Sequence, residues 1–171
     1  MSNTLIIIPS RMKAQRLPGK PLLKINGLSI ISHVVKRAKE TQIGEVIVAT
    51  EDDEIIEDVK KNNGEAILTS KGHKSGTDRI WEAYKKLNIK NIDFIINLQG
   101  DEPLINVEDI RNLDFITKQN TSKITTLASK IDNEDILLNK NIVKAQTESD
   151  LEENKSSKAI DFFRKKEGIE K

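Results

Sequence analysis

The sequence predicts an α/β protein in which a mostly parallel sheet is flanked by helices. Short apolar runs rich in β-branched residues alternate with segments of helical periodicity, which favours parallel pairing. The runs lack polar alternation, so both faces of the sheet are expected to be covered. In such sheets ligands bind beyond the carboxyl ends of the strands, and the loops that follow the strands are therefore the first place to search for a site.

The strands are expected where apolar runs end at turn residues. The main runs are residues 5–8, 45–50, 65–69 and 93–99. Pro9 is expected to end the first strand, because it lacks an amide proton. Two further strands are predicted at residues 124–131 and 141–147.

The helices are predicted from apolar residues at helical spacing. In residues 29–40 these are Ile30, Ile31, Val34, Val35 and Ala38. A second helix is expected after Thr50, which is predicted to cap it, and a third covers residues 77–87 with Thr77 as its cap. Another helix is expected to start near Asn106, and a short one within residues 156–168.

The amino-acid composition excludes several classes of protein and of site. The 28 basic and 27 acidic residues balance, so no overall field favours nucleic acid or an anionic membrane. The absence of cysteine excludes disulfides, thiolate metal sites and a thiol nucleophile. No signal sequence or membrane span is recognised, so we expect a cytoplasmic protein. The chain of 171 residues is expected to form an α/β domain at residues 1–149, followed by a linker and further segment at 150–171.

A cationic loop follows the first strand. It carries Arg11, Lys13, Arg16 and Lys20, and Gly19 would let the backbone approach a ligand closely. Arginine can grip phosphate or carboxylate with two parallel hydrogen bonds, and lysine supplies a compact charge. The loop therefore suits an anionic ligand, although a solvated basic loop explains the charge equally well.

Two more polar loops are predicted on the same edge of the sheet. Residues 70–77 place Ser75, Gly76 and Thr77 at a helix start, which is either a hydrogen-bonding cradle or an ordinary cap. Residues 99–103 place Asp101 behind a glycine at a strand end, which suits Mg²⁺ bound with substrate phosphates but also an ordinary turn. His73 has no neighbour at ligand spacing and is not expected to bind a metal. The combination of three such loops favours a binding site.

Four segments in order resemble one family. "IPSRMKAQRLPGKPL", "VATEDDEI", "HKSGTDRI" and "NLQGDEP" are similar to the 3-deoxy-D-manno-octulosonate (Kdo) cytidylyltransferases, from residue 5 to about residue 143. The resemblance implies a three-layer fold like that of the nucleotide-diphospho-sugar transferases. It also implies that CTP and Kdo give CMP-Kdo and pyrophosphate, with Mg²⁺, for lipopolysaccharide biosynthesis.

The resemblance also implies roles for individual residues. Arg11 and Lys20 would neutralise the triphosphate, and Asp101 would be both catalytic and the Mg²⁺ ligand. Arg16 would order the basic loop or contact phosphate. The residues implied to hold cytidine or line the base and sugar are Pro9, Ser10, Ser75, Gly76, Thr77, Arg79 and Gln99.

The sequence departs from the family pattern in two places. Ala14 stands where the family has a small hydroxyl residue. A His-x-Gly-Ile-Tyr segment and a late Gly-Val-Asp-Thr-Pro-Glu-Asp motif, whose Asp is a second metal ligand, do not occur here. The expectation is therefore the N-terminal two-thirds of the enzyme, with CTP binding retained and turnover nearly lost, and with a homodimer formed only when the family's C-terminal segment is present.

Three alternatives remain open from the sequence. Besides a Kdo cytidylyltransferase, the chain could be a truncated fragment that binds CTP without turnover or is inert, a cytidylyltransferase for another sugar acid, or a phosphate-binding scaffold without turnover.

Overall fold

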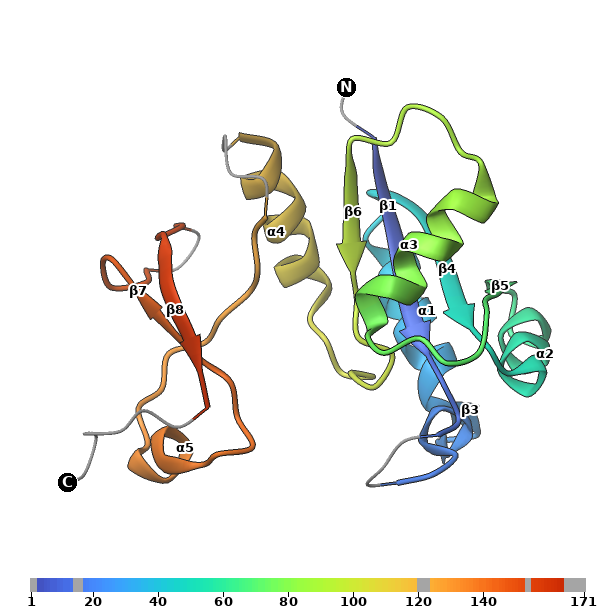
Figure 1. Ribbon diagram of the computed structural model, residues 1–171, viewed down its shortest axis with the longest axis horizontal. Coiled ribbons are helices and arrows are strands. Elements are labelled where there is room, and N and C mark those ends of the chain that lie inside the picture. Colours follow the sequence, from blue (N-terminus) through green and yellow to red (C-terminus); the bar gives the residue numbers. More distant parts are fainter. Residues whose placement is uncertain (1–2, 14–16, 120–123, 153–154, 165–171) are drawn as a thin grey trace. The chain divides into compact units, whose positions relative to one another are not determined.

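The computed structural model describes residues 3–13, 17–119, 124–152 and 155–164 (Figure 1). Contacts divide the chain into two units, Met1–Asp114 and Phe115–Lys171. The boundary predicted from the sequence lies later, between residues 149 and 150. It differs because residues on either side of 149 pair in one hairpin of the second unit, so the polar stretch there connects two strands.

The first unit is built on a sheet of parallel strands. They are β1 (Thr4–Ser10), β4 (Gly44–Thr50), β5 (Glu65–Leu68) and β6 (Phe94–Asn97). Their order is β5-β4-β1-β6, and each neighbouring pair is parallel. The predicted parallel sheet is confirmed, and all its carboxyl ends meet at one edge.

Pro9 lies inside β1, so the prediction that it ends the first strand is wrong. It is in register with Ala49 of β4, and the strand continues to Ser10. On the other side, β6 pairs only as far as Ile7, whose carbonyl accepts the Leu98 amide. The backbone polar groups of alternate residues in a strand point toward the same neighbouring strand, so those of Pro9, like those of Ile7, point toward β6. Because the pairing with β6 stops at Ile7, the missing amide proton of Pro9 removes no hydrogen bond between the strands.

The helices form close to where periodicity places them. They are α1 (Ile30–Glu40), α2 (Asp53–Lys61), α3 (Gly76–Leu87) and α4 (Val107–Gln119). Two predicted caps are wrong. Asp52 occupies the cap position of α2 in place of Thr50, and Ser75 caps α3 in place of Thr77, with the Ser75 hydroxyl accepting the Asp78 amide. In both helices the residue directly before the first turn has the extended backbone that a cap requires.

Helices cover both faces of the sheet (Figure 1). Alternate residues of β1 point to opposite faces, so Ile6 and Ile8 pack with α1 and α2, whereas Leu5 and Ile7 pack with α3. Ile110 of α4 joins the first of these two clusters. The result is the predicted three-layer α/β arrangement.

Short elements connect β1 to α1. A single 3-10 turn, η1 (Lys20–Leu22), follows the basic loop and leads into a small antiparallel pair, β2 (Lys24–Ile25) and β3 (Leu28–Ser29). Ser29 then caps α1 by accepting the Ser32 amide. The basic loop is therefore followed at once by ordered structure.

The second unit holds a short helix and a hairpin. They are α5 (Glu134–Leu138), β7 (Lys144–Thr147) and β8 (Ala159–Phe163), with β7 and β8 antiparallel. The strand predicted at 141–147 is confirmed as β7. The helix expected within 156–168 is wrong over its described part, which is β8. The strand predicted at 124–131 is also wrong, because that segment pairs with no strand in the part of the chain that the structure describes.

Across the described residues, every helix is too short or too polar to cross a bilayer.

Candidate functional site

The site lies at the carboxyl edge of the sheet in the first unit, which we call the rim. The loops after β1, β5 and β6 meet there around Pro9. A Cβ on Gly76 would lie 3.3 Å from the Pro9 ring, and one on Gly100 would lie 3.0 Å from the Pro9 carbonyl oxygen. Because a side chain at either glycine would crowd Pro9, the two glycines allow this close approach. The three polar loops predicted to share one edge are therefore brought together.

An ion pair joins the first and third loops. Lys20 Nζ lies 2.7 Å from Asp101 Oδ2, and the side chains are 33% and 57% exposed. Such an exposed pair is weak, so an incoming phosphate can compete for the lysine. Arg11 is exposed and makes no ion pair with the described residues. Arg16, expected to order the loop, lies outside the described residues.

The base of the basic loop is pinned at Met12. The Met12 amide donates to Asp52 Oδ2 at 2.8 Å, and its carbonyl accepts the Gly19 amide at 2.9 Å. Gly19 has φ of +72°, which a side chain would disfavour. Sequence reasoning missed Asp52, whose carboxylate serves the loop while its backbone starts α2. The signal was an aspartate directly before a helix, but no local pattern indicates which amide it accepts.

The second loop ends at the N-terminus of α3. Ser75, Gly76 and Thr77 are all exposed there, and Ser75 already caps the helix. Exposed hydroxyls and free amides at a helix start suit an anionic or hydrogen-bonding ligand. Ser10, the last residue of β1, is only 7% exposed.

Arg79 is buried beneath the rim, which differs from the expected substrate contact. Its side chain is 3% exposed and donates to Thr69 Oγ1 and Glu51 Oε2, each at 2.6 Å. The hydrogen bond from Arg79 lowers the pKa of Glu51 and outweighs the effect of burial. The guanidinium thus joins α3 to the residues directly after β4 and β5, beneath the surface.

Asp101 offers oxygen to a metal. Its carboxylate is exposed at the end of the turn after β6, and Gln99 beside it is also exposed and donates to Asn97 Oδ1 at 3.2 Å. No group of three or more His, Cys, Asp or Glu able to hold a metal occurs in the part of the chain that the structure describes. One carboxylate fits Mg²⁺ only in its usual mode, in which substrate phosphates supply further oxygens.

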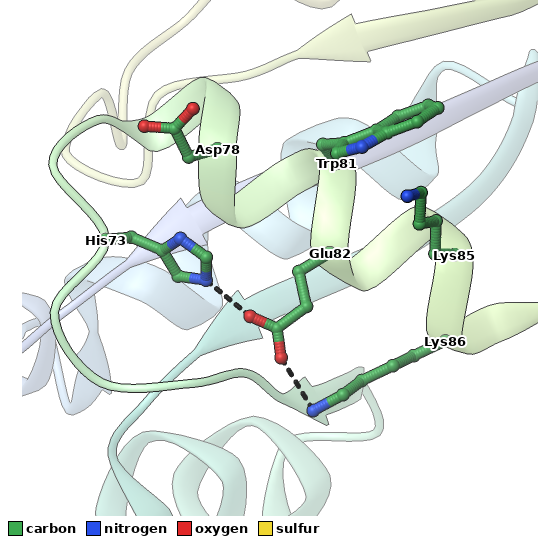
Figure 2. Close-up of a pocket in the computed structure, with 6 residues that line it drawn as sticks. All are labelled: His73, Asp78, Trp81, Glu82, Lys85 and Lys86. Atoms are coloured by element: carbon green, nitrogen blue, oxygen red, sulfur yellow. Dashed lines mark hydrogen bonds and ion pairs between the residues drawn. The ribbon is translucent and has the colours of Figure 1, made fainter.

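A shallow cavity of about 480 Å³ lies on the outer side of α3 (Figure 2). Its lining residues are His73, Asp78, Trp81, Glu82, Lys85 and Lys86. Figure 2 shows the Glu82 carboxylate between His73, with which it shares a hydrogen bond, and Lys86, with which it forms an ion pair. His73 thus has a carboxylate partner nine residues away in the sequence, a separation that local metal-ligand spacing does not predict.

Glu82 should make the stability of the protein sensitive to acid. Hydrogen bonds from Lys86, and then from His73 and Ser70, lower the pKa of Glu82 from 4.5 to about 2. Because the folded value lies below the unfolded one, these contacts stabilise the fold fully above pH 4.5, and their contribution is lost as the pH falls toward 2. We expect Glu82→Gln to unfold at a lower temperature than wild type at pH 7, and the gap to close near pH 2. Thermal unfolding at both pH values measures this, and a gap independent of pH would contradict it.

Comparison with known proteins places the chain in a family. The cytidylyltransferase family profile matches residues 5–170. The 3-deoxy-manno-octulosonate cytidylyltransferase of Nitrobacter winogradskyi is 47% identical over 145 residues, which are 84% of this chain and 57% of that protein. The protein of the same name from Thermodesulfovibrio yellowstonii is 47% identical over 147 residues, 82% of this chain and 58% of that protein.

A solved structure resembles the fold as well. It is CMP:2-keto-3-deoxy-manno-octonic acid synthetase complexed with CTP, with 33% identity and a TM-score of 0.79, over 95% of this chain and 64% of that chain. The chain spans 57% and 58% of the length of the two curated relatives. On the family profile and on these similarities, the chain belongs to the cytidylyltransferase family.

Proposed function

We propose that the protein is a 3-deoxy-manno-octulosonate cytidylyltransferase, which transfers the cytidylyl group of CTP to Kdo and releases pyrophosphate. The observation that carries the proposal is the meeting of three loops at the rim, one basic, one rich in hydroxyls and one ending in a carboxylate. Its similarity to a synthetase complexed with CTP supports the choice of nucleotide. The names of the curated relatives support Kdo as the acceptor.

Arg11 and Lys20 would hold the triphosphate. Both belong to the connection between β1 and α1. The hydrogen bond from the Met12 amide to Asp52 keeps the neighbouring Arg11 near the end of the strand. On binding, Lys20 would exchange its ion pair with Asp101 for phosphate oxygens, which releases the carboxylate. Arg16 is proposed as a further phosphate contact.

Asp101 would hold Mg²⁺ together with the phosphates. The metal, when bound, supplies positive charge that stabilises the charge developing on the transferred phosphoryl group. The carboxylate suits this ion because Mg²⁺ prefers oxygen ligands. Lys20 beside it adds a fixed positive charge on the same side of the rim.

The cytidine would lie between β1 and α3. Pro9 and Ser10 end the strand, Gly76 lies against the Pro9 ring, and Ser75 and Thr77 flank Gly76 as exposed residues at the helix start. Gln99 is exposed at the same edge and is proposed to contact the base or the sugar. Arg79 would act from below by holding these elements in place.

Positioning would account for most of the catalysis. The anomeric hydroxyl of Kdo forms a bond to the α-phosphorus, the bond to the β-phosphate oxygen breaks, and the hydroxyl proton is released. Charge leaves with pyrophosphate, so cations placed at the triphosphate stabilise the transition state more than the ground state. Arg11 and Lys20 are the described cations placed to do this.

The setting of the reaction follows from the resemblance. We propose that CMP-Kdo feeds lipopolysaccharide biosynthesis, that the reaction takes place in the cytoplasm, and that the enzyme works as a homodimer when the family's C-terminal segment is present.

The decisive test is product formation from CTP, Kdo and Mg²⁺. Pyrophosphate release and detection of CMP-Kdo by mass spectrometry should both require all three components. Product with another sugar acid but not with Kdo would replace the acceptor in the proposal. CTP binding without any product would favour a nucleotide-binding module, and the absence of both would overturn the proposal.

CTP should stabilise the protein more than ATP, GTP or UTP does. The reason is that the hydroxyl and amide groups at Ser75–Thr77 can recognise a base, whereas the basic loop accepts any triphosphate. A ligand at 100 times its dissociation constant stabilises a protein by about 2.7 kcal/mol. Thermal unfolding with each nucleotide and Mg²⁺ measures the preference, and equal shifts for all four would leave only a general phosphate site.

A further inference from the structure

Glu82 faces backward from α3 onto the loop that precedes this helix. Its Oε1 and Oε2 accept the Ser70 amide at 2.9 and 3.0 Å, and Oε1 also accepts the Ser70 hydroxyl at 2.9 Å. His73 Nε2 pairs with Oε2, as Figure 2 shows. The carboxylate therefore contacts one backbone amide and two side chains of residues 69–75, more contacts than an ion pair along the helix surface would require.

The same loop is held at both ends. At its start the Thr69 amide donates a hydrogen bond to the Thr50 carbonyl at 2.7 Å, and the Thr69 hydroxyl accepts one from the Arg79 guanidinium. At its end Ser75 caps α3. Between these points Glu82 forms hydrogen bonds with the loop, in a stretch where Ser70 and Lys71 are exposed and Gly72 has φ of +90°. An exposed turn with a left-handed glycine gains little from packing, so side-chain hydrogen bonds decide its conformation.

The geometry points to Glu82 as a positioning residue for the nucleotide site. We define the carboxylate latch as Glu82 with Ser70 and His73. By holding residues 69–75 in one conformation, the latch presents Ser75–Thr77 to the nucleotide at the end of β1. The inference rests on the proposed function and adds to it a residue that acts through the loop without touching substrate.

A simpler explanation is that Glu82 only stabilises α3. It pairs with Lys86 one turn later at 2.7 Å, the spacing at which exposed pairs add slightly to helix stability. The two explanations separate at Lys86. If the helix pair is the purpose of Glu82, then Lys86→Met and Glu82→Gln should behave alike. If the latch is its purpose, Glu82→Gln should disturb the loop around Ser70 and His73, whereas Lys86→Met should affect only its start, where Lys86 donates to the Leu68 carbonyl.

The first measurement is amide hydrogen exchange of residues 69–75 without nucleotide. Glu82→Gln keeps the shape of the side chain but removes the charge and replaces one acceptor oxygen by a donor, so the charge-assisted hydrogen bonds to Ser70 are weakened and the oxygen that pairs with His73 is lost or displaced. Exchange in the loop should become about tenfold faster, the scale of losing one hydrogen bond to a charged group. Lys86→Met should accelerate it less than Glu82→Gln does, because Lys86 contacts the loop only at its start, through the Leu68 carbonyl at 2.9 Å. His73→Ala, a change outside the helix, should act in the same direction as Glu82→Gln.

The second measurement is CTP affinity by calorimetry. Glu82→Gln should weaken binding by about fivefold to tenfold, because part of the binding energy then orders the loop. In a steady-state assay the loss should appear in KM for CTP, with kcat changed less than twofold. Glu82→Asp, which keeps the charge, should recover part of the affinity. If Glu82 only stabilised α3, Glu82→Gln would change neither KM for CTP nor amide exchange in residues 69–75 more than other properties of the protein.

The outcomes separate the latch from the proposed function. Unchanged loop exchange in Glu82→Gln overturns the latch whatever CTP does. Faster exchange with unchanged CTP affinity overturns the positioning role. If wild type binds no CTP, the proposed function fails, and the exchange data alone then decide whether Glu82 holds the loop.

Discussion

Replacing Lys20 by alanine should weaken CTP binding, or lower the rate of cytidylyl transfer, by about tenfold or more, the scale of a charge-assisted phosphate contact. Lys20 lies at the start of η1 beside the rim. Its Nζ is 2.7 Å from Oδ2 of Asp101, the proposed Mg²⁺ ligand. Removing the ammonium group takes away a cation and leaves Asp101 free to repel the triphosphate. Both effects act in the same direction.

Calorimetry with CTP and a pyrophosphate assay measure the loss. Lys24→Ala is the matched control, because Lys24 is an exposed lysine of the same connection with no ion pair among the described residues. It should change affinity by less than twofold, since an exposed charge away from the ligand is screened by salt. Equal affinity and equal turnover in Lys20→Ala and wild type would remove Lys20 from the proposed triphosphate site.

Replacing Arg79 by methionine should lower the free energy of unfolding by about 3 kcal/mol or more, because breaking a buried ion pair strands the remaining charge. Arg79 is 3% exposed and Glu51 11%, so the partner left behind has little access to water. Thr69 also loses its donor. For a unit of this size the loss corresponds to a fall of roughly 10 °C or more in Tm.

Urea unfolding followed by the fluorescence of Trp81, the single tryptophan of the chain, reports on α3 directly. Arg37→Met is the matched control, since the exposed pair of Arg37 with Glu40 should contribute less than about 1 kcal/mol. Adding Glu51→Gln to Arg79→Met should recover part of the stability, because no charge is then left unpaired. Similar losses in Arg79→Met and Arg37→Met would refute the buried pair as a stabilising element.

Local patterns located the strands and helices of the first unit, although not all of their ends, and were insufficient for the second. In the first, apolar runs and helical spacing mark β1, β4 and α1 closely, because each buries a continuous face in the core. In the second, residues 124–131 are rich in β-branched residues but pair with no strand among the described residues, and Ile124 is 89% exposed. The segment read as a helix forms β8 because β7, fifteen or so residues earlier, supplies its hydrogen bonds.

The sequence by itself determined the class of fold, the meeting of three polar loops at one edge of the sheet, and the family resemblance. These follow from periodicity, from the rule that parallel strands share a carboxyl edge, and from short motifs, all of which are local. Tertiary structure alone decided the partners of the charged groups. Asp52 holds Met12 and Arg79 is buried against Glu51, while Glu82 reaches back to Ser70. Each of these pairs joins residues 12 to 40 positions apart, and only the folded topology, which sets distance and burial, determines which charge meets which partner.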